Sequence, residues 1–591
     1  MKRSLTFRGG LCLFAAMLLI SSCTQSKTKT LFELAKSGTA SVIRSSIKKG
    51  ADVNEKNEEG ETPLMIAAKF NSNPDALRAL LNAGNITRSS TDESIIIDAS
   101  PQAPDVNAKT ASGQTALMYA ARYNTNSYYA VKLLIDAGAD VNAKNKDGTT
   151  VLMQAVLGDK PSLDTVKAII EAKANINARD NNGATALILA ARQNAPHTIL
   201  KALIDSGCDT DAKDYDGMSA LMTIVQNETP NIQSIKVLLD AGVDVNAQTD
   251  SGQTALMCAV QNEYITLDVI KTLIGAGAAV GAADKDESTV LMYAARYSKN
   301  PDVIKLLIDE GADVNAKDKN PLTALMWAAR YNSNPEIIKG LVAAKADVNA
   351  RTEDEGESAL MQAAGYNENA DMVKALIESG ANVNARTKNG ATALMYAVAN
   401  ENPNLDMIKM LIENGANVNA KTQIGRSALL FAVILDRDSQ VVSTLLDGGA
   451  DAKDKDNDNV PALLWAAFEN TDPSVIRVLI EAGSDIRSKY KDGRTALMFY
   501  VLNNENPNAS AIKAFADAGA DVNARDKKGM SPLMIAVQNE NTNPDAIRAL
   551  IDAGSDVSSK SYYDKRAIDY LDDNTTLYGT DTYWNIRDLL Y

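Results

Sequence analysis

Histidine and cysteine are scarce in this chain, and their scarcity removes most routes to a catalytic or metal-binding site. The sequence contains one histidine and four cysteines in 591 residues. Structural zinc sites, Ser-His-Asp triads and Cys-His pairs all depend on these residue types. The one histidine, His197, follows Asn-Ala-Pro in what reads as a surface loop. We therefore expect no catalytic residues, no metal ligands and no cofactor.

The chain also lacks an excess of positive charge. It has 60 lysines and arginines against 75 aspartates and glutamates, which gives a formal net charge of −15. Nucleic-acid binders obtain much of their affinity from cations that neutralise phosphates. The sequence therefore predicts no nucleic-acid partner, and neutral or basic proteins are the partners that its overall charge favours.

No apolar run is long enough for a transmembrane helix, but the N-terminus carries a short one. Lys2, Arg3 and Arg8 precede the apolar segment Leu11–Ile20. A membrane-spanning helix needs roughly 20 apolar residues, so this shorter run fits the hydrophobic region of a secretory signal peptide. The sequence Ile-Ser-Ser-Cys that ends at Cys23 resembles a bacterial lipobox. In that family the cysteine is diacylated and becomes the first residue of the mature protein.

The resemblance divides the N-terminus into a signal peptide over residues 1–22 and a polar tether over residues 23–30. It implies a lipid anchor on Cys23, and two or three acyl chains hold a protein stably on a membrane. Thr24, rather than aspartate, follows the cysteine, which favours the outer membrane in a host with two membranes. The alternative is an ordinary signal peptide with a chance cysteine.

The remaining cysteines do not predict a disulfide framework. Cys12 leaves with the signal peptide, and Cys208 and Cys258 lie in sequence units that are two apart. A disulfide needs Cα atoms about 5.5 Å apart. We expect two free and mostly buried thiols.

One sequence pattern recurs from residue 31 almost to the C-terminus. Residues 113–142 and 390–419 share a Gly-x-Thr-Ala-Leu-Met-Tyr-Ala start and end in Gly-Ala-Asp/Asn-Val-Asn. The pattern predicts a capped first helix, a second helix with apolar residues at i, i+3 and i+4, a left-handed glycine and an extended finger. Units of this kind bury their apolar faces by stacking on their neighbours. From residue 113 the spacing is 34 to 36 residues, with unit starts at Gly60, Gly113, Gly148, Gly183, Gly217, Gly252, Glu287, Pro321, Gly356, Gly390, Gly425, Asn459, Gly493 and Gly529.

This pattern resembles the ankyrin repeat, and the resemblance covers about nine-tenths of the chain. It implies an all-α repeat solenoid of stacked helix-turn-helix units with β-hairpin-like fingers. Tandem repeats, about 15 units, are assigned to residues 31–563, with a truncated copy at residues 31–54. Residues 564–591 are interpreted as a degenerate C-terminal capping repeat. An insertion at residues 85–104 interrupts the period, and long loops of this kind are usually functional or disordered.

Two departures from the ankyrin pattern are informative. Methionine replaces the family's histidine in the first helix of most units, and its fixed helical position predicts a core residue rather than a ligand groove. Most units are also two residues longer than the family's usual length. The extra residues lie between the two helices, as in Asn332-Ser-Asn-Pro-Glu336, where asparagine suits an N-cap and proline the first helical turn.

In ankyrin proteins the concave face is formed by the fingers and by the two residues after the Ala-Ala pair. Arginine and aromatic residues, which often anchor interfaces, occur at these positions. They could instead shield helix ends in this type of repeat, and the neighbouring Trp327 and Trp465 are interpreted as packing residues. The candidate partner-binding residues are Phe70, Arg122, Tyr123, Arg296, Tyr297, Arg330, Tyr331 and Tyr366.

A calcium loop is a weaker reading of Asp454, Asp456 and Asp458. Asn459 stands where the glycine of such a loop should be, and Trp465 where its glutamate should be. The same aspartates lie in the finger of their repeat, and we favour that interpretation.

The sequence therefore favours a non-enzymatic protein-interaction scaffold, anchored by lipid at the bacterial cell envelope. It would be a monomeric array that binds another protein on its concave face. The alternative is a structural or self-associating envelope protein without a single client. An enzyme that uses paired acids is disfavoured, because those acids mostly fall at exposed repeat positions.

Overall fold

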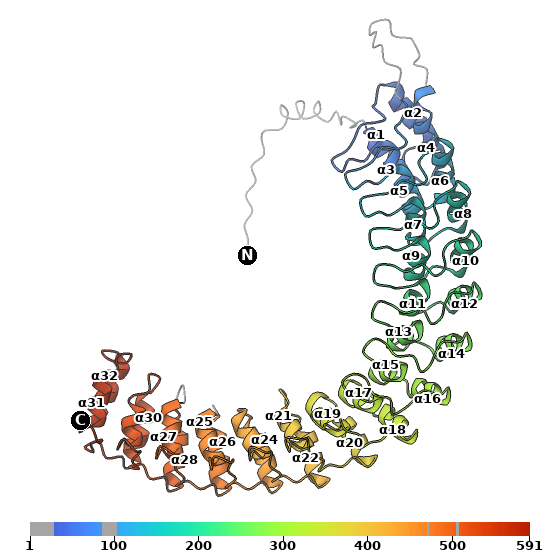
Figure 1. Cartoon of the computed structure of the whole chain (residues 1–591). Helices are drawn as coiled ribbons and strands as arrows, with labels where there is room; N and C mark the ends of the chain where they lie inside the picture. The colour runs from blue at the N-terminus through green and yellow to red at the C-terminus, as the bar shows by residue number, and fades with distance from the viewer. Residues whose placement is uncertain (1–28, 86–102, 470–471, 504–506) are drawn as a thin grey trace, which may run out of the picture. The chain divides into compact units, whose positions relative to one another are not determined.

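Paired helices recur throughout the described part of the chain, because each sequence unit encodes two short amphipathic segments separated by capping residues. The computed structural model describes residues 29–85, 103–469, 472–503 and 507–591. Within these residues the 32 α-helices form consecutive antiparallel pairs, each followed by a finger (Figure 1). The chain divides into two compact units, residues 1–244 and 245–591. None of the helices within these ranges is long and apolar enough to cross a membrane.

The first unit contains two rows of helices. Each first helix packs against the first helix of the next repeat, and each second helix does the same. The first helices are α1 (Leu31–Ser37), α3 (Pro63–Phe70), α5 (Ala116–Tyr123), α7 (Val151–Val156), α9 (Ala186–Arg192) and α11 (Ala220–Val225). The second helices are α2 (Ala40–Lys48), α4 (Pro74–Leu81), α6 (Ser127–Asp136), α8 (Leu163–Glu171), α10 (His197–Asp205) and α12 (Ile232–Asp240), and a 3₁₀ turn, η1 (Ala83–Asn85), follows α4.

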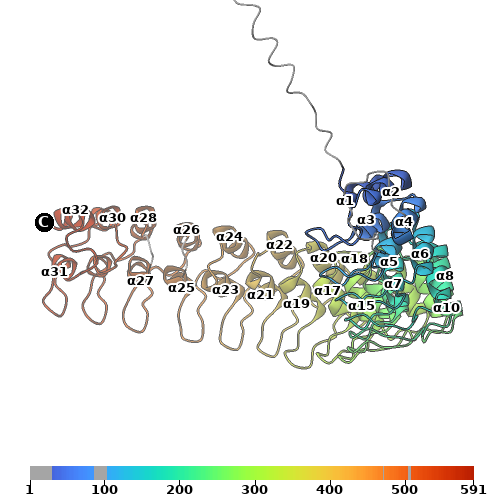
Figure 2. The same ribbon diagram turned by 90° about the horizontal axis from the view of Figure 1, so that it is seen from above.

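The second unit has the same two rows, and its fingers project from one side of the first-helix row (Figure 2). Its first helices are α13 (Ala255–Gln261), α15 (Val290–Tyr297), α17 (Ala324–Tyr331), α19 (Ala359–Tyr366), α21 (Ala393–Ala399), α23 (Ala428–Ile434), α25 (Ala462–Glu469), α27 (Ala496–Asn503), α29 (Pro532–Ala536) and α31 (Ala567–Asp572). Its second helices are α14 (Leu267–Gly275), α16 (Pro301–Asp309), α18 (Pro335–Ala343), α20 (Ala370–Glu378), α22 (Leu405–Glu413), α24 (Ser439–Asp447), α26 (Pro473–Glu481), α28 (Ala509–Asp517), α30 (Pro544–Asp552) and α32 (Asp581–Leu590).

The fingers are hairpin-like, as the sequence predicted. Isolated antiparallel bridges close seven of them, for example Lys144 with Thr150 and Lys317 with Thr323. Left-handed residues allow the chain to leave each second helix and to turn at each finger tip. Gly138, with φ of +89°, follows α6, and Gly148, with φ of +75°, forms the turn of the next finger.

The recurring methionines lie in the core, which confirms their sequence interpretation. Met118, Met257 and Met326 are each at most 1% exposed. In six repeats the thioether sulfur also accepts the backbone N–H of the helix-capping threonine or serine, as Met65 does from Thr62 at 3.4 Å. The methionine therefore packs the core and weakly caps its own helix, while the threonine hydroxyl accepts from the methionine N–H.

The lengthened connection between the helices contains two asparagines with different roles. Asn334 caps α18 as predicted, because its Oδ1 accepts the N–H of Glu336 at 3.0 Å and Pro335 opens the helix. Asn332 is 4% exposed and reaches into the preceding repeat. Its Nδ2 donates to the carbonyl oxygens of Ala295 and Ser298 at 2.8 and 2.9 Å, and its Oδ1 accepts the N–H of Asn334 at 2.8 Å. One amide therefore satisfies two carbonyls of the repeat before it.

We call this recurring contact the helix-end ladder. Its members share an Nδ2 donor that reaches a carbonyl in the preceding repeat, and they are Asn71, Asn124, Asn227, Asn332, Asn367, Asn400, Asn539 and Asn574. Arg437 occupies the same place in its repeat and donates to the carbonyl oxygens of Val398 and Ala399. Since buried carbonyls need hydrogen-bond donors, the ladder fixes how far one repeat slides on the next.

A second set of asparagines, the finger ladder, connects the fingers in the opposite direction along the chain. Asn349 donates to the carbonyl of Gly380 at 3.2 Å and accepts the N–H of Asn382 at 2.8 Å, both in the following repeat. The left-handed conformation of Gly380 presents that carbonyl. The same two bonds are made by Asn54, Asn107, Asn142, Asn246, Asn315, Asn384, Asn419 and Asn523.

The finger ladder also continues across the interruption expected at residues 85–104, of which residues 86–102 lie outside the described structure. Asn54 donates to the carbonyl of Ala103 at 3.1 Å and accepts the N–H of Asp105 at 2.8 Å. Gly84 lies beside Ala103, since a Cβ added to this glycine would be 3.3 Å from the Ala103 Cβ. The two ends of the insertion therefore meet, and the repeat contacts continue across it.

His197 is exposed, as expected, but its placement in a loop is wrong. It is the first residue of α10, which Pro196 precedes at the N-cap position.

The helix-end ladder predicts different losses of stability when two neighbouring asparagines, Asn332 and Asn334, are replaced. Asn332→Asp replaces the buried Nδ2 donor with an oxygen that faces two carbonyls, and should lower the free energy of unfolding by at least ~2 kcal/mol. Asn334→Asp is the matched control, because aspartate also caps a helix. It removes the bond from Asn334 Nδ2 to the Lys299 carbonyl at 2.8 Å as well, but that bond is exposed to solvent, so its loss should cost less. Urea unfolding of the full chain followed by circular dichroism measures both. Equal midpoints for the two variants would contradict the ladder.

Candidate protein-interaction surface

The best candidate surface lies at the ends of consecutive first helices in the second unit. We call Arg296, Tyr297, Arg330, Tyr331 and Tyr366 the Arg–Tyr row. They end α15, α17 and α19, which pack side by side. Because each repeat places the same two positions after its Ala-Ala pair, packing in register aligns them.

The rings of this row are exposed although they belong to packed helices. Tyr297, Tyr331 and Tyr366 are 37%, 43% and 48% exposed, whereas the alanines one turn earlier are buried. An exposed run of large rings is uncommon on a solvated surface and is typical of an interaction site.

Each arginine of the row stacks on the tyrosine of the following repeat. The guanidinium carbon of Arg296 lies 4.1 Å from the ring centroid of Tyr331, and that of Arg330 lies 4.1 Å from the centroid of Tyr366. The distances to the tyrosines of their own repeats, Tyr297 and Tyr331, are longer, at 4.9 and 5.3 Å. Cation–π contacts therefore run between repeats and keep each guanidinium group over the ring of the next repeat.

Tyr293 and Trp327 form a second aromatic layer, which packs against the Arg–Tyr row. The Tyr293 hydroxyl donates to Asp284 Oδ2 at 2.6 Å, and Trp327 Nε1 donates to Asp318 Oδ2 at 3.0 Å. Burial and then the bond to Asp284 raise the pKa of Tyr293 well above its usual value. The Trp327 ring centroid lies 5.8 Å from that of Tyr293 and 6.0 Å from that of Tyr331. The aspartates belong to the fingers, so these bonds fix the rings to the repeat frame.

The row ends at Gly365, which stands where the next arginine would be. A Cβ at this position would lie 2.8 Å from Cδ1 of Tyr396. Tyr396 packs into the space, and its hydroxyl donates to Glu357. The absence of a side chain at Gly365 therefore admits a tyrosine from the next repeat.

The first unit contains a separate aromatic cluster, formed by Phe70, Arg122 and Tyr123. Phe70 is 47% exposed and Tyr123 51% exposed. Lys69, between them, pairs with Glu61 at 3.1 Å and lies 4.7 Å from the Tyr119 ring centroid. Burial would raise the pKa of Glu61, but hydrogen bonding and charge from Lys69 lower it below its usual value. Arg122 donates to Gln154 Oε1 at 3.1 Å.

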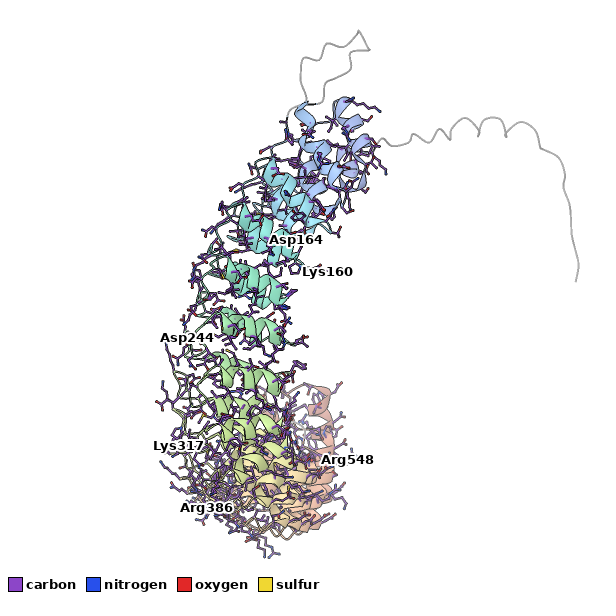
Figure 3. All side chains as sticks on the ribbon, turned by 90° about the vertical axis from the view of Figure 1, so that its right-hand side faces the viewer. Lys160, Asp164, Asp244, Lys317, Arg386 and Arg548 are labelled. Atoms are coloured by element: carbon purple, nitrogen blue, oxygen red, sulfur yellow. The ribbon has the colours of Figure 1, made fainter. Side chains whose placement is uncertain are left out.

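Several other basic groups of the second unit have partners within the structure. On the finger side, Arg351 donates to the carbonyl of Arg386 at 2.7 Å, and Arg386 donates to that of Lys421. Lys317 pairs with Glu353 at 3.1 Å. Figure 3 shows Lys317 and Arg386 along this edge and Arg548 on the opposite side of the unit. Neither Arg296 nor Arg330 forms an ion pair among the residues that the structure describes, and Arg330 Nη1 donates to Gln362 Oε1 at 3.4 Å.

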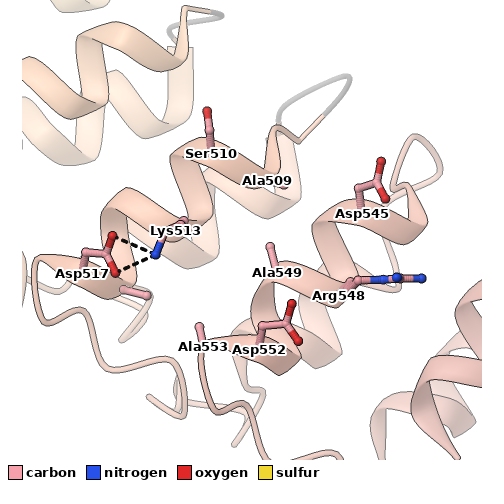
Figure 4. Close-up of a pocket in the computed structure, with 10 residues that line it drawn as sticks. Ala509, Ser510, Lys513, Asp517, Asp545, Arg548, Ala549, Asp552 and Ala553 are labelled. Atoms are coloured by element: carbon pink, nitrogen blue, oxygen red, sulfur yellow. Dashed lines mark hydrogen bonds and ion pairs between the residues drawn. The ribbon is translucent and has the colours of Figure 1, made fainter.

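The second unit has two further hollows, which differ in volume and in the side chains that line them. A groove of about 480 Å³ lies between α28 and α30, with alanines on its floor and Lys513 paired with Asp517 at its rim (Figure 4). A smaller pocket of about 200 Å³ is lined by rings that the sequence analysis did not bring together, from Trp465, Phe468, Tyr490 and Phe499. Trp465 and Trp327 each donate to an aspartate nine residues earlier, which confirms both as packing residues.

The three aspartates considered as a calcium loop have protein partners, as the finger interpretation expects. Asp454 pairs with Lys421 at 2.5 Å and Asp458 with Lys491 at 2.7 Å. Asp456 accepts from Trp465 and from the backbone of its own turn. Within the described ranges no group of three or more histidine, cysteine or acidic residues could hold a metal ion.

The chain belongs to the ankyrin-repeat family. The family model for ankyrin repeats, which represents three copies, matches overlapping segments at residues 31–145, 124–214, 187–284, 263–352, 325–422, 360–456, 399–489 and 463–561. The match and the helical pairs together confirm the predicted fold class. A comparison with curated proteins finds no significant match. Ankyrin repeats generally mediate protein–protein interactions, and proteins built from them are typically non-enzymatic.

The two cysteines of the repeats are free, as expected, and their environments predict slow chemistry. Burial raises the pKa of both the Cys208 and the Cys258 thiol to about 11. Since only the thiolate reacts, about one molecule in a thousand would be reactive at pH 8. Iodoacetamide labelling of the folded chain should therefore be slow at pH 8 and accelerate as the pH approaches 11.

Mass spectrometry of the peptides that contain Cys208 and Cys258 measures this labelling. The urea-unfolded chain is the control, because its thiols have ordinary pKa values. Labelling of the folded chain at the unfolded rate at pH 8 would show that the thiols are not buried as described.

Proposed function

We propose that this chain is a lipid-anchored scaffold of the bacterial cell envelope that binds another protein through the Arg–Tyr row. The observation that carries the proposal is the run of exposed tyrosines with stacked arginines between them, in a family that generally mediates protein interactions. Stacking restrains the long arginine side chains before a partner arrives. The entropy lost on binding is therefore smaller than for freely rotating arginines.

The proposed partner surface consists of the row together with the residues that hold it. Tyrosine and arginine are the residue types in which interface binding energy most often concentrates. The finger aspartates fix the second aromatic layer, so the exposed rings present a defined face. Phe70, Arg122 and Tyr123 form a second, smaller candidate contact in the first unit.

The envelope location rests on the N-terminal sequence, since Cys23 and the signal-like segment lie outside the described residues. A lipid on Cys23 would keep the array at the membrane surface and bring its partner there. The polar tether, residues 23–30, ends next to α1, whose N-cap is Thr30.

Capture of a partner from intact envelopes tests the row. Replacing Tyr297, Tyr331 and Tyr366 with alanine and reversing Arg296 and Arg330 to glutamate should reduce the captured partner at least ~100-fold, since each anchor contributes strongly. Quantitative mass spectrometry of cross-linked complexes measures the loss.

The control for this capture is Arg548→Glu, which reverses an exposed arginine of α30 that lies away from the row. Unchanged capture by the row variant would refute the proposed surface. Concentration-dependent assembly of the purified chain with no captured partner would favour a structural, self-associating protein instead.

The lipid anchor predicts a count of reactive thiols. In the mature protein extracted from membranes and unfolded in urea, Cys208 and Cys258 should react and Cys23 should not, because its sulfur would carry the diacylglycerol. Thiol titration gives the count, and a chain that begins at Thr24, without the signal segment and Cys23, should stay out of the membrane fraction and show the same count of two. A third reactive thiol in the unmodified mature protein would show that Cys23 is not lipidated.

A further inference from the structure

The arginines of the Arg–Tyr row differ in charge environment from the chain as a whole. The protein carries a net charge of −15, and overall charge alone favours a neutral or basic partner. Locally, Arg296 and Arg330 form no ion pair within the described ranges. Each guanidinium lies over the ring of the next repeat's tyrosine, and one N–H of Arg330 donates to Gln362 Oε1 at 3.4 Å, which leaves its other N–H groups for a ligand. Asp284 and Asp318 accept hydrogen bonds from Tyr293 and Trp327 and form no ion pair with these arginines. The row therefore offers two guanidinium groups to an anion.

The spacing of the row restricts the shape of that anion. Successive first helices pack about 8–10 Å apart, so one arginine and one exposed ring recur at this interval. A polyproline-II helix advances about 9.3 Å in one turn of three residues, which places every third side chain on the same face. A β-strand puts residues i and i+3 on opposite faces, so it does not match a row with one contact per repeat.

The exposed rings suit the remaining positions of such a segment. Proline-rich segments dock on aromatic surfaces, because their preformed helix loses little entropy on binding. Tyr297, Tyr331 and Tyr366 present one ring per repeat. The guanidinium groups that lie on these rings can each take a carboxylate in a bidentate bond.

We propose that the Arg–Tyr row binds an acidic, proline-rich segment of a partner protein in the polyproline-II conformation, with a carboxylate at every third residue. The carboxylates bind Arg296 and Arg330, and the prolines between them lie against the tyrosine rings. Gly365 ends the row, so the segment makes two successive carboxylate contacts. This inference rests on the proposed function and specifies its partner.

A set of synthetic peptides tests the spacing directly. The probe is a fluorescein-labelled peptide of four Pro-Pro-Glu triplets, and its binding to the full chain is followed by fluorescence anisotropy. One control peptide replaces glutamate with glutamine, and a second has the same composition with all glutamates at one end. The triplet peptide should bind at least ~10-fold more tightly than either control, because only it pairs both arginines while laying proline on the rings.

Variants of the chain test the contacts. The double variant Arg296→Lys and Arg330→Lys keeps the charge but loses the planar fork, and should lose most of the preference for the triplet peptide. Arg548→Lys, on α30, should bind as the unmodified chain does. Circular dichroism checks that each variant is folded.

Equal binding of the triplet and block peptides, no binding of the triplet peptide, or binding that does not change in the double lysine variant would overturn this inference. These results are separable from failure of the proposed function. If the row variant loses its envelope partner and the triplet peptide does not bind to the unmodified chain, the Arg–Tyr row is still an interaction surface. Only the acidic polyproline-II segment is then rejected as its partner.

Discussion

The interaction on which the surface of this protein depends is an asparagine side-chain amide, which joins eight of the described repeats to the repeat before each of them. The side chain of Asn332 or Asn367 supplies a donor to carbonyls at the end of the preceding first helix, where no backbone N–H is available. Apolar packing alone would tolerate small slides between neighbouring helices, because the hydrophobic effect is not directional. Hydrogen bonds at 2.8–2.9 Å remove that freedom.

The fixed register explains how a contact surface arises from residues that are 35 or 36 positions apart in sequence. Arg296 reaches the ring of Tyr331, and Arg330 that of Tyr366, only because the helices that carry them keep one relative position. The finger ladder joins neighbouring fingers in the same way. Within single repeats, Asp284 and Asp318 of the fingers hold the aromatic residues Tyr293 and Trp327 of the first helices. Stability and the alignment of the Arg–Tyr row therefore share one structural cause, which is the repetition of the same polar contacts.

Much of the fold could be predicted from sequence because its determinants are local. Thr115 before an apolar run, Gly138 after it and the Asn-Pro step before α18 each specify a helix end within a few residues. The positions of the candidate residues on exposed helix ends followed from the same periodicity. Contacts between repeats could not be derived in this way. In Asn332-Ser-Asn334 the sequence predicted only an N-cap role for asparagine, and nothing local distinguishes the buried one. The stacking of Arg296 on the next repeat's tyrosine, rather than mainly on its own, also depends on helix packing. An acid nine residues before an aromatic residue, as in Asp318 and Trp327, was a usable signal that was missed.

The most direct test of whether the helix-end ladder holds neighbouring repeats in register is hydrogen exchange followed by mass spectrometry. The measurement uses the full chain that carries both Asn332→Asp and Asn367→Asp. Because stability in a repeat array is shared between neighbours, we expect faster backbone exchange in α15 to α20 and unchanged exchange in α28 to α32. Exchange in α15 to α20 at the rate of the unmodified chain would contradict the account.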